Sequence, residues 1–105
     1  MNVHMVYITT SDKKEARQIG RTLIDEKLVA CVNIFDGINS MYQWNGELQD
    51  DTEAVLVAKT HPSRIPELIE RVKALHSYEC PCIVSLPISA GNPEFLAWVA
   101  REVNA

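Results

Sequence analysis

The chain has 105 residues, of which 47% are apolar, and a net charge of −4. Its length fits a single domain over residues 1–105. The ten Lys and Arg residues are scattered, which argues against a nucleic-acid-binding surface and against binding to an anionic membrane. No apolar stretch approaches the roughly 20 residues of a membrane span, and the first ten residues lack the pattern of a secretory signal. With an odd number of cysteines, three, these features predict a cytoplasmic protein with free thiols.

The N-terminal quarter predicts a strand followed by a helix. Residues 3–9 are rich in β-branched side chains and alternate in polarity, as a strand does. Asp12 is the expected N-cap of a helix that continues to about Lys27, with Glu15 as its capping-box partner. The apolar residues of this helix share one face, which should pack on a sheet.

The middle of the chain predicts a long β-hairpin. Residues 28–35 form a continuous apolar run that indicates a buried strand. The Asn-Gly pair at 45–46 favours a type I′ turn, because both residues tolerate positive φ. The arms should run over about 29–44 and 48–60, and a bulge near residues 36–37 is the alternative that would fold this long hairpin back over its own domain.

The last part of the chain predicts a helix, a strand and a final helix. The first helix begins near Ser63 and carries Pro66 in its first turn, where the missing N–H does little harm. Residues 82–88 predict a strand in which Pro87 requires a strand end or an edge position. Asn92 is the expected N-cap of a short terminal helix that opens with Pro93.

These elements give the order βαββαβ plus a C-terminal helix. That order predicts an α+β, ferredoxin-like fold, an antiparallel sheet with two helices on one face. The hairpin arms are longer than the helices above them, so part of the hairpin should overhang the domain. Because the overhang carries Met41, Tyr42 and Trp44, it needs a cover, and a second copy of the chain is the simplest one.

The segment HSYECPC at 76–82 combines several metal-binding side chains. Thiolates of Cys80 and Cys82, with His76 and Glu79 nearby, would suit Cu(I) or Zn(II). The one-residue spacing between the cysteines is shorter than that of usual thiolate pairs and disfavours a disulfide between them. The alternative is that Cys82 lies in a core strand with Val84 and Leu86, and that His76 simply complements the end of a helix.

Two other side chains, Cys31 and Lys59, could have either a structural or a functional role. Cys31 lies within an apolar segment and, taken alone, reads as a core residue. Lys59 follows apolar Val57 and Ala58 at a strand end, where a solvated lysine is the ordinary expectation. The sequence has no G-x-S-x-G, no P-loop and no G-x-G-x-x-G, and we expect a protein that is not an enzyme.

Several segments together resemble the CutA divalent-cation-tolerance family. They occur in order over nearly the whole chain: ACVNI (30–34), MYQWNGEL (41–48), KT (59–60), HSYECP (76–81), LPI (86–88) and FLAWV (95–99). The resemblance implies a ferredoxin-like subunit that assembles as a trimer like that of the PII signalling proteins. It also implies a role in tolerance of divalent cations, copper especially.

The resemblance also implies where the polar residues of the family fall. Those near the clefts between subunits are Cys31, Tyr42, Trp44, Glu53, Lys59, His76, Tyr78 and Glu79. Two positions depart from the common family pattern, since Ser77 replaces a proline and Cys82 replaces a glutamate. The loss of that carboxylate favours a softer metal, with Cys31, His76, Glu79, Cys80 and Cys82 as candidate ligands.

Two functions follow as expectations. The first is a cytoplasmic homotrimer of metal tolerance that binds divalent or soft transition metal ions, with copper as the candidate but no obligatory cofactor. The second is a PII-like signalling or adaptor trimer whose clefts between subunits bind a small anionic ligand or a partner protein.

Overall fold

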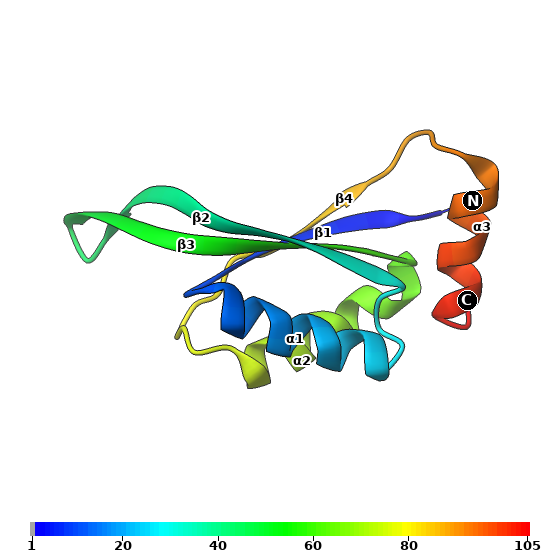
Figure 1. Cartoon of the computed structure of the whole chain (residues 1–105), viewed down its shortest axis with the longest axis horizontal. Helices are drawn as coiled ribbons and strands as arrows, with labels where there is room; N and C mark the ends of the chain where they lie inside the picture. The colour runs from blue at the N-terminus through cyan, green and yellow to red at the C-terminus, as the bar shows by residue number, and fades with distance from the viewer. Residues whose placement is uncertain (1) are drawn as a thin grey trace.

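The computed structural model describes residues 2–105 as a four-stranded antiparallel sheet with helices packed against it (Figure 1). The elements in chain order are β1 (His4–Thr10), α1 (Lys13–Asp25), β2 (Cys31–Trp44), β3 (Glu47–Thr60), a 3₁₀ turn (Pro62–Arg64), α2 (Ile65–Leu75), β4 (Ile83–Pro87) and α3 (Pro93–Glu102). The strands lie in the order β2-β3-β1-β4. This confirms the α+β prediction, its βαββαβ element order and the C-terminal helix. Within residues 2–105, no helix has both the length and the apolar character that crossing a membrane would require.

The sheet has one covered face. Figure 1 shows α1 and α2 together beneath the sheet, with α3 at one end of it. Alternate residues of β1 and β3 point to these helices, among them Val6, Ile8 and Leu56, which are fully buried. They pack with buried side chains of α1 and α2 in one hydrophobic cluster, which supplies most of the stabilisation from apolar burial.

The predicted N-cap of α1 is confirmed. The Asp12 carboxylate accepts a hydrogen bond from the Glu15 N–H at 2.8 Å. The Glu15 carboxylate does not complete the capping box at Asp12, because it accepts instead from the backbone N–H of Ser11 at 2.9 Å. The helix ends at Asp25, two residues before the predicted end, and Lys27 then takes a left-handed conformation with φ 58°.

The long hairpin is also confirmed. Asn45 and Gly46 have φ 52° and 80°, as a type I′ turn requires. The register of β2 against β3 shifts between Phe35 and Ile38, where Gly37 has φ 71°. This bulge does not fold the hairpin back over the domain. Beyond it the hairpin extends past the helical layer, at the left of Figure 1, in a molecule 44 Å long.

The second face of the sheet is open in the single chain. Val84 and Leu86 of β4 are 50% and 52% exposed, and Cys82 before them is also exposed. The alternative that placed Cys82 in the core with Val84 and Leu86 is therefore wrong for the single chain. The register explains why: Ile83 pairs with buried Ile8, so the helix-facing positions of β4 are the odd ones.

Candidate functional site

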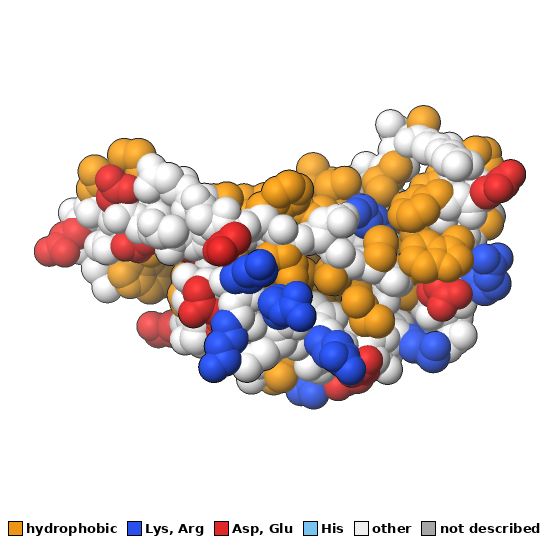
Figure 2. Space-filling model, in the orientation of Figure 1, with side chains coloured by type: hydrophobic (Ala, Val, Ile, Leu, Met, Phe, Trp, Pro, Cys, Tyr) orange, Lys and Arg blue, Asp and Glu red, His pale blue; other side chains and the backbone are white. Residues whose placement is uncertain are grey.

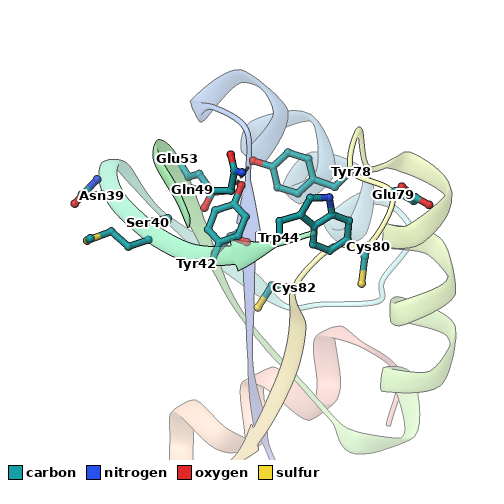
Figure 3. Close-up of a pocket in the computed structure, with 12 residues that line it drawn as sticks. Asn39, Ser40, Tyr42, Trp44, Gln49, Glu53, Tyr78, Glu79, Cys80 and Cys82 are labelled. Atoms are coloured by element: carbon teal, nitrogen blue, oxygen red, sulfur yellow. Dashed lines mark hydrogen bonds between the residues drawn. The ribbon is translucent and has the colours of Figure 1, made fainter. Parts of the chain in front are cut away.

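A cleft of about 730 Å³ lies where the β2–β3 hairpin faces the segment between α2 and β4 (Figure 3). Its walls combine aromatic rings, carboxylates and thiols. The lining residues are Thr9, Asn39, Ser40, Met41, Tyr42, Trp44, Gln49, Glu53, Tyr78, Glu79, Cys80 and Cys82. Of the eight residues that the family resemblance places near clefts between subunits, five line this cleft of the single chain, and Cys31, Lys59 and His76 do not.

Glu53 and Tyr78 form the buried end of the cleft. Glu53 lies on β3 and is only 6% exposed. The Tyr78 hydroxyl donates a short hydrogen bond to Glu53 Oε2. Burial of the phenol and this hydrogen bond to a carboxylate raise the pKa of Tyr78. Tyr78 therefore remains a hydrogen-bond donor over the whole physiological pH range.

Tyr42 and Trp44 bring two further rings to the cleft from one face of β2. The Tyr42 hydroxyl donates to Asp51 Oδ2 at 2.7 Å, and this bond raises the pKa of Tyr42. In Figure 3 the rings of Tyr42, Tyr78 and Trp44 surround the space next to Glu53. Trp44 is 45% exposed, so its indole is open to solvent in the single chain.

His76 supports the cleft from behind and does not line it. The residue is the C-cap of α2, directly after the last helical residue, Leu75. Its Nε2 lies 2.8 Å from the Thr9 carbonyl oxygen, and the Tyr78 N–H lies 3.0 Å from its Nδ1. Because a carbonyl can only accept and an N–H can only donate, Nε2 carries the proton and Nδ1 is the acceptor. Both ring nitrogens are thus occupied, and in this arrangement His76 offers no free lone pair to a metal ion.

Glu15 is a positioning residue that the sequence did not reveal. One carboxylate oxygen accepts from Ser11, and the other accepts from the backbone N–H of Ser77 at 2.8 Å. Burial alone would raise the pKa of Glu15, but the hydrogen bonds from Ser11 and Ser77 outweigh it and lower the pKa. Glu15 therefore ties the start of α1 to the segment that carries Tyr78. The pattern around Asp12 predicted only a helix cap, because Ser77 lies 62 residues away.

Cys80 and Cys82 both line the cleft and both are exposed. Figure 3 shows their sulfur atoms on opposite sides of the chain, with the Glu79 carboxylate directed away from the aromatic rings. The two thiols are thus available to a soft ligand at the mouth of the cleft. Their opposed directions do not form a closed site in one chain.

Cys31 lies apart from these two cysteines. It pairs with Lys59 at the opposite end of the sheet, in the row of Met5 and Leu86. Burial raises the pKa of the Cys31 thiol, and the nearby Lys59 ammonium offsets part of that rise. Lys59 itself donates a hydrogen bond to the Asn33 side chain. Within residues 2–105, no three or more His, Cys, Asp or Glu side chains gather closely enough to hold a metal ion, so one chain does not bring the five predicted ligands together.

Residues 4–102 match the family model described as CutA1 divalent ion tolerance protein. The divalent-cation tolerance protein CutA of Thermus thermophilus is 48% identical over 98 residues, covering 93% of this chain and 95% of that protein. The corresponding protein of Archaeoglobus fulgidus is 41% identical and covers 95% of this chain and 97% of its own length. Some relatives are longer: the chain spans 64% of the Xenopus laevis CutA homolog and 55% of the chloroplastic CutA 1 of Oryza sativa.

Solved structures agree with this likeness over nearly the whole chain. The crystal structure of CutA from Xylella fastidiosa superposes with a TM-score of 0.95 at 34% identity, covering 98% of this chain and 99% of that one. A CutA structure from Archaeoglobus fulgidus, described as a periplasmic divalent cation tolerance protein, gives a TM-score of 0.93 at 40% identity. It covers 96% of this chain and 98% of the other.

Proposed function

Since this chain belongs to the CutA1 divalent ion tolerance family, we propose that it serves metal tolerance by binding a soft transition metal, Cu(I) above all, through Cys80 and Cys82. The observation that carries the proposal is the pair of exposed thiols at the mouth of one cleft. Thiolates prefer Cu(I) or Zn(II), whereas Mg²⁺ and Ca²⁺ prefer oxygen ligands. The role is one of binding, not catalysis.

A second copy of the chain completes the site in this proposal. One chain supplies two thiols with opposed directions, and the remaining candidate ligands lie elsewhere. A homotrimer in which the hairpin of one copy reaches another would bring further side chains to the cleft. The support is the overhanging hairpin with its exposed Met41, Tyr42 and Trp44. We place the trimer in the cytoplasm because free thiols are stable there.

The test is competitive titration of the reduced protein with Cu(I) against a chelator of known affinity. We expect the double substitution Cys80→Ser with Cys82→Ser to weaken binding at least ~100-fold, because both soft ligands are lost. Cys31→Ser is compared with it, because this thiol at the other end of the sheet is a candidate ligand that a neighbouring copy would have to supply. If the double variant binds Cu(I) as tightly as the wild type, the thiolate site is wrong.

The PII-like alternative has less support. An anionic ligand requires positive charge or a set of free donors, and none of the residues lining this cleft is Lys, Arg or His. Binding of an anion would therefore depend on Lys59 or on residues supplied by neighbouring copies.

A further inference from the structure

We propose that the part of the cleft formed by Glu53, Tyr42, Tyr78 and Trp44 binds a small organic ammonium ion with N–H donors, such as an alkylamine. This inference does not depend on the metal site. It uses the aromatic and carboxylate side of the cleft and not the thiols at its mouth. Three independent observations support it: the charge of the walls, the free acceptors and the ring faces.

The walls of the cleft carry negative charge without compensating positive charge. The sequence contains no Lys, Arg or His between residues 28 and 58, nor between 77 and 100, and these two segments supply every lining residue except Thr9. The first segment has five Asp and Glu residues. Figure 2 shows Lys and Arg gathered over the helical layer, whereas the hairpin end at the left shows only acidic charged side chains. The field in the cleft therefore attracts cations.

Glu53 offers an unused acceptor in this field. Its Oε2 accepts from the Tyr78 hydroxyl, while Oε1 accepts no hydrogen bond from the side chains or backbone of residues 2–105. No buried side-chain oxygen within the described residues lacks a partner, so Oε1 must keep access to the cleft. A carboxylate that is largely buried yet open on one side is suited to a charged N–H donor, because hydrogen bonds between charged partners are the stronger ones.

The nearest hydroxyls also act as acceptors toward a ligand. The Tyr78 hydroxyl already donates its hydrogen bond to Glu53, and the Tyr42 hydroxyl donates its hydrogen bond to Asp51. Each phenol oxygen then presents lone pairs, and each ring presents the negative face of its π-system. Trp44 adds the ring type that attracts cations most strongly. Acceptors and ring faces together match an ammonium group carried on a short apolar chain.

The experiment compares three four-carbon ligands of similar size by isothermal titration calorimetry, in EDTA and at fixed ionic strength. They are the diammonium ion putrescine, the neutral 1,4-butanediol and the dianion succinate. We expect putrescine to bind and the other two to show no measurable binding. Glu53→Gln keeps the shape of the side chain but removes its charge, and it should weaken putrescine binding at least ~10-fold.

Two controls separate this site from general attraction and from the metal site. Glu94→Gln removes the same charge from α3, at the other end of the molecule, and should leave the affinity for putrescine unchanged. Cys80→Ser with Cys82→Ser should also leave it unchanged, even though that variant loses Cu(I). The inference is overturned if succinate binds as well as putrescine, or if Glu53→Gln and Glu94→Gln weaken binding equally. Should Glu53→Gln fail to fold, Trp44→Leu provides the second test, and an unaltered affinity there would contradict the role of the ring.

Discussion

Tyr78 and Glu53 meet from positions 25 residues apart and close the buried end of the cleft. Replacing Tyr78 by Phe leaves the buried Glu53 carboxylate without its donor. We expect the free energy of unfolding to fall by about 1–3 kcal/mol, the usual cost of an unsatisfied buried polar group. Urea denaturation at pH 7 measures the change. Tyr7→Phe is the matched control, since its hydroxyl makes no hydrogen bond within the described residues, and an equal loss there would argue against the Glu53 contact as the cause.

The same pair predicts how stability changes in alkali. The pKa of Tyr78 in the folded protein lies above the ordinary value of 10.0. As the pH rises past 10, an unfolded chain releases this proton while the folded chain retains it, so the unfolded state binds fewer protons and stability falls. Below pH 10 the contribution is fully present. Denaturation midpoints between pH 9 and 11 should therefore drop less steeply in Tyr78→Phe than in the wild type.

The Glu15 carboxylate predicts that the stability of the fold falls as the pH is lowered into the acid range. Its pKa lies below the ordinary value of 4.5 because of the hydrogen bonds from Ser11 and Ser77. Its stabilising contribution is present above pH 4.5 and is lost as the pH falls through the folded-state pKa. Glu15→Gln should cost about 1 kcal/mol at pH 7 and much less at pH 3. Denaturation at the two pH values tests this, with Glu102→Gln as the exposed control; a penalty independent of pH would contradict the charged role of Glu15.

His76 shows what a sequence cannot predict about a single side chain. The motif correctly indicated an important residue at the end of α2. It did not indicate that both ring nitrogens are used by Thr9 and Tyr78, because the Thr9 contact joins positions 67 residues apart. A histidine in a motif rich in thiols and carboxylates favours a ligand role, and only the tertiary contact reveals a structural one.

At the scale of elements, the hairpin turn gives the clearest prediction. Gly46 has φ 80°, and a Cβ placed there would meet no atom within 4 Å. Gly46→Ala therefore tests backbone strain without a clash, and we expect a loss of about 1–2 kcal/mol. Gly91→Ala, whose Cβ would make ordinary contacts with Leu96 from 3.4 Å outward, should be close to neutral. Chemical denaturation of both variants distinguishes them, and equal effects would contradict the left-handed turn.

Elements with strong local signals were predicted well. The N-caps at Asp12 and Asn92 and the turn at 45–46 depend on neighbouring residues, and the structure has each of them. The orientation of β4 was not predictable in this way. Its apolar residues Val84 and Leu86 share the face away from the helices, whereas polar Ser85 lies on the helix-facing side, so alternation favoured the wrong face.

At the scale of the whole molecule, the proposed trimer makes a direct prediction. Light scattering at micromolar concentration should give three times the chain mass of 11.8 kDa. Trp44→Ala on the overhang should weaken assembly by ~2 kcal/mol or more if the indole is buried between copies. Ile24→Ala removes an exposed apolar side chain from α1 and serves as the control. A monomeric wild type would contradict the trimer.

Assembly should also appear in the melting temperature. Association stabilises only the folded state, so the melting temperature should rise with protein concentration. A constant value over a hundredfold range, with reversible unfolding, would argue against coupled folding and assembly.

One chain brings together only some of the predicted site residues, and their place between subunits stays a prediction. Tyr42, Trp44, Glu53 and Tyr78 do line one cleft. The separation of Cys31 from Cys80 and Cys82 follows from strand order, because two other strands lie between β2 and β4. Distances between residues on different strands depend on this order and register, which no local motif records.

The position of β1 has a consequence for how the chain is made. A ribosome produces this strand first, yet both of its neighbours, β3 and β4, come later. At a synthesis rate of roughly 5–20 residues per second, β1 waits about 2–10 seconds for the part of β3 that pairs with it. Its apolar residues remain without a partner strand during that interval, in which α1 and then β2 are completed. The last pairing joins Pro87 to His4, so the nascent sheet closes only after most of the chain has been translated.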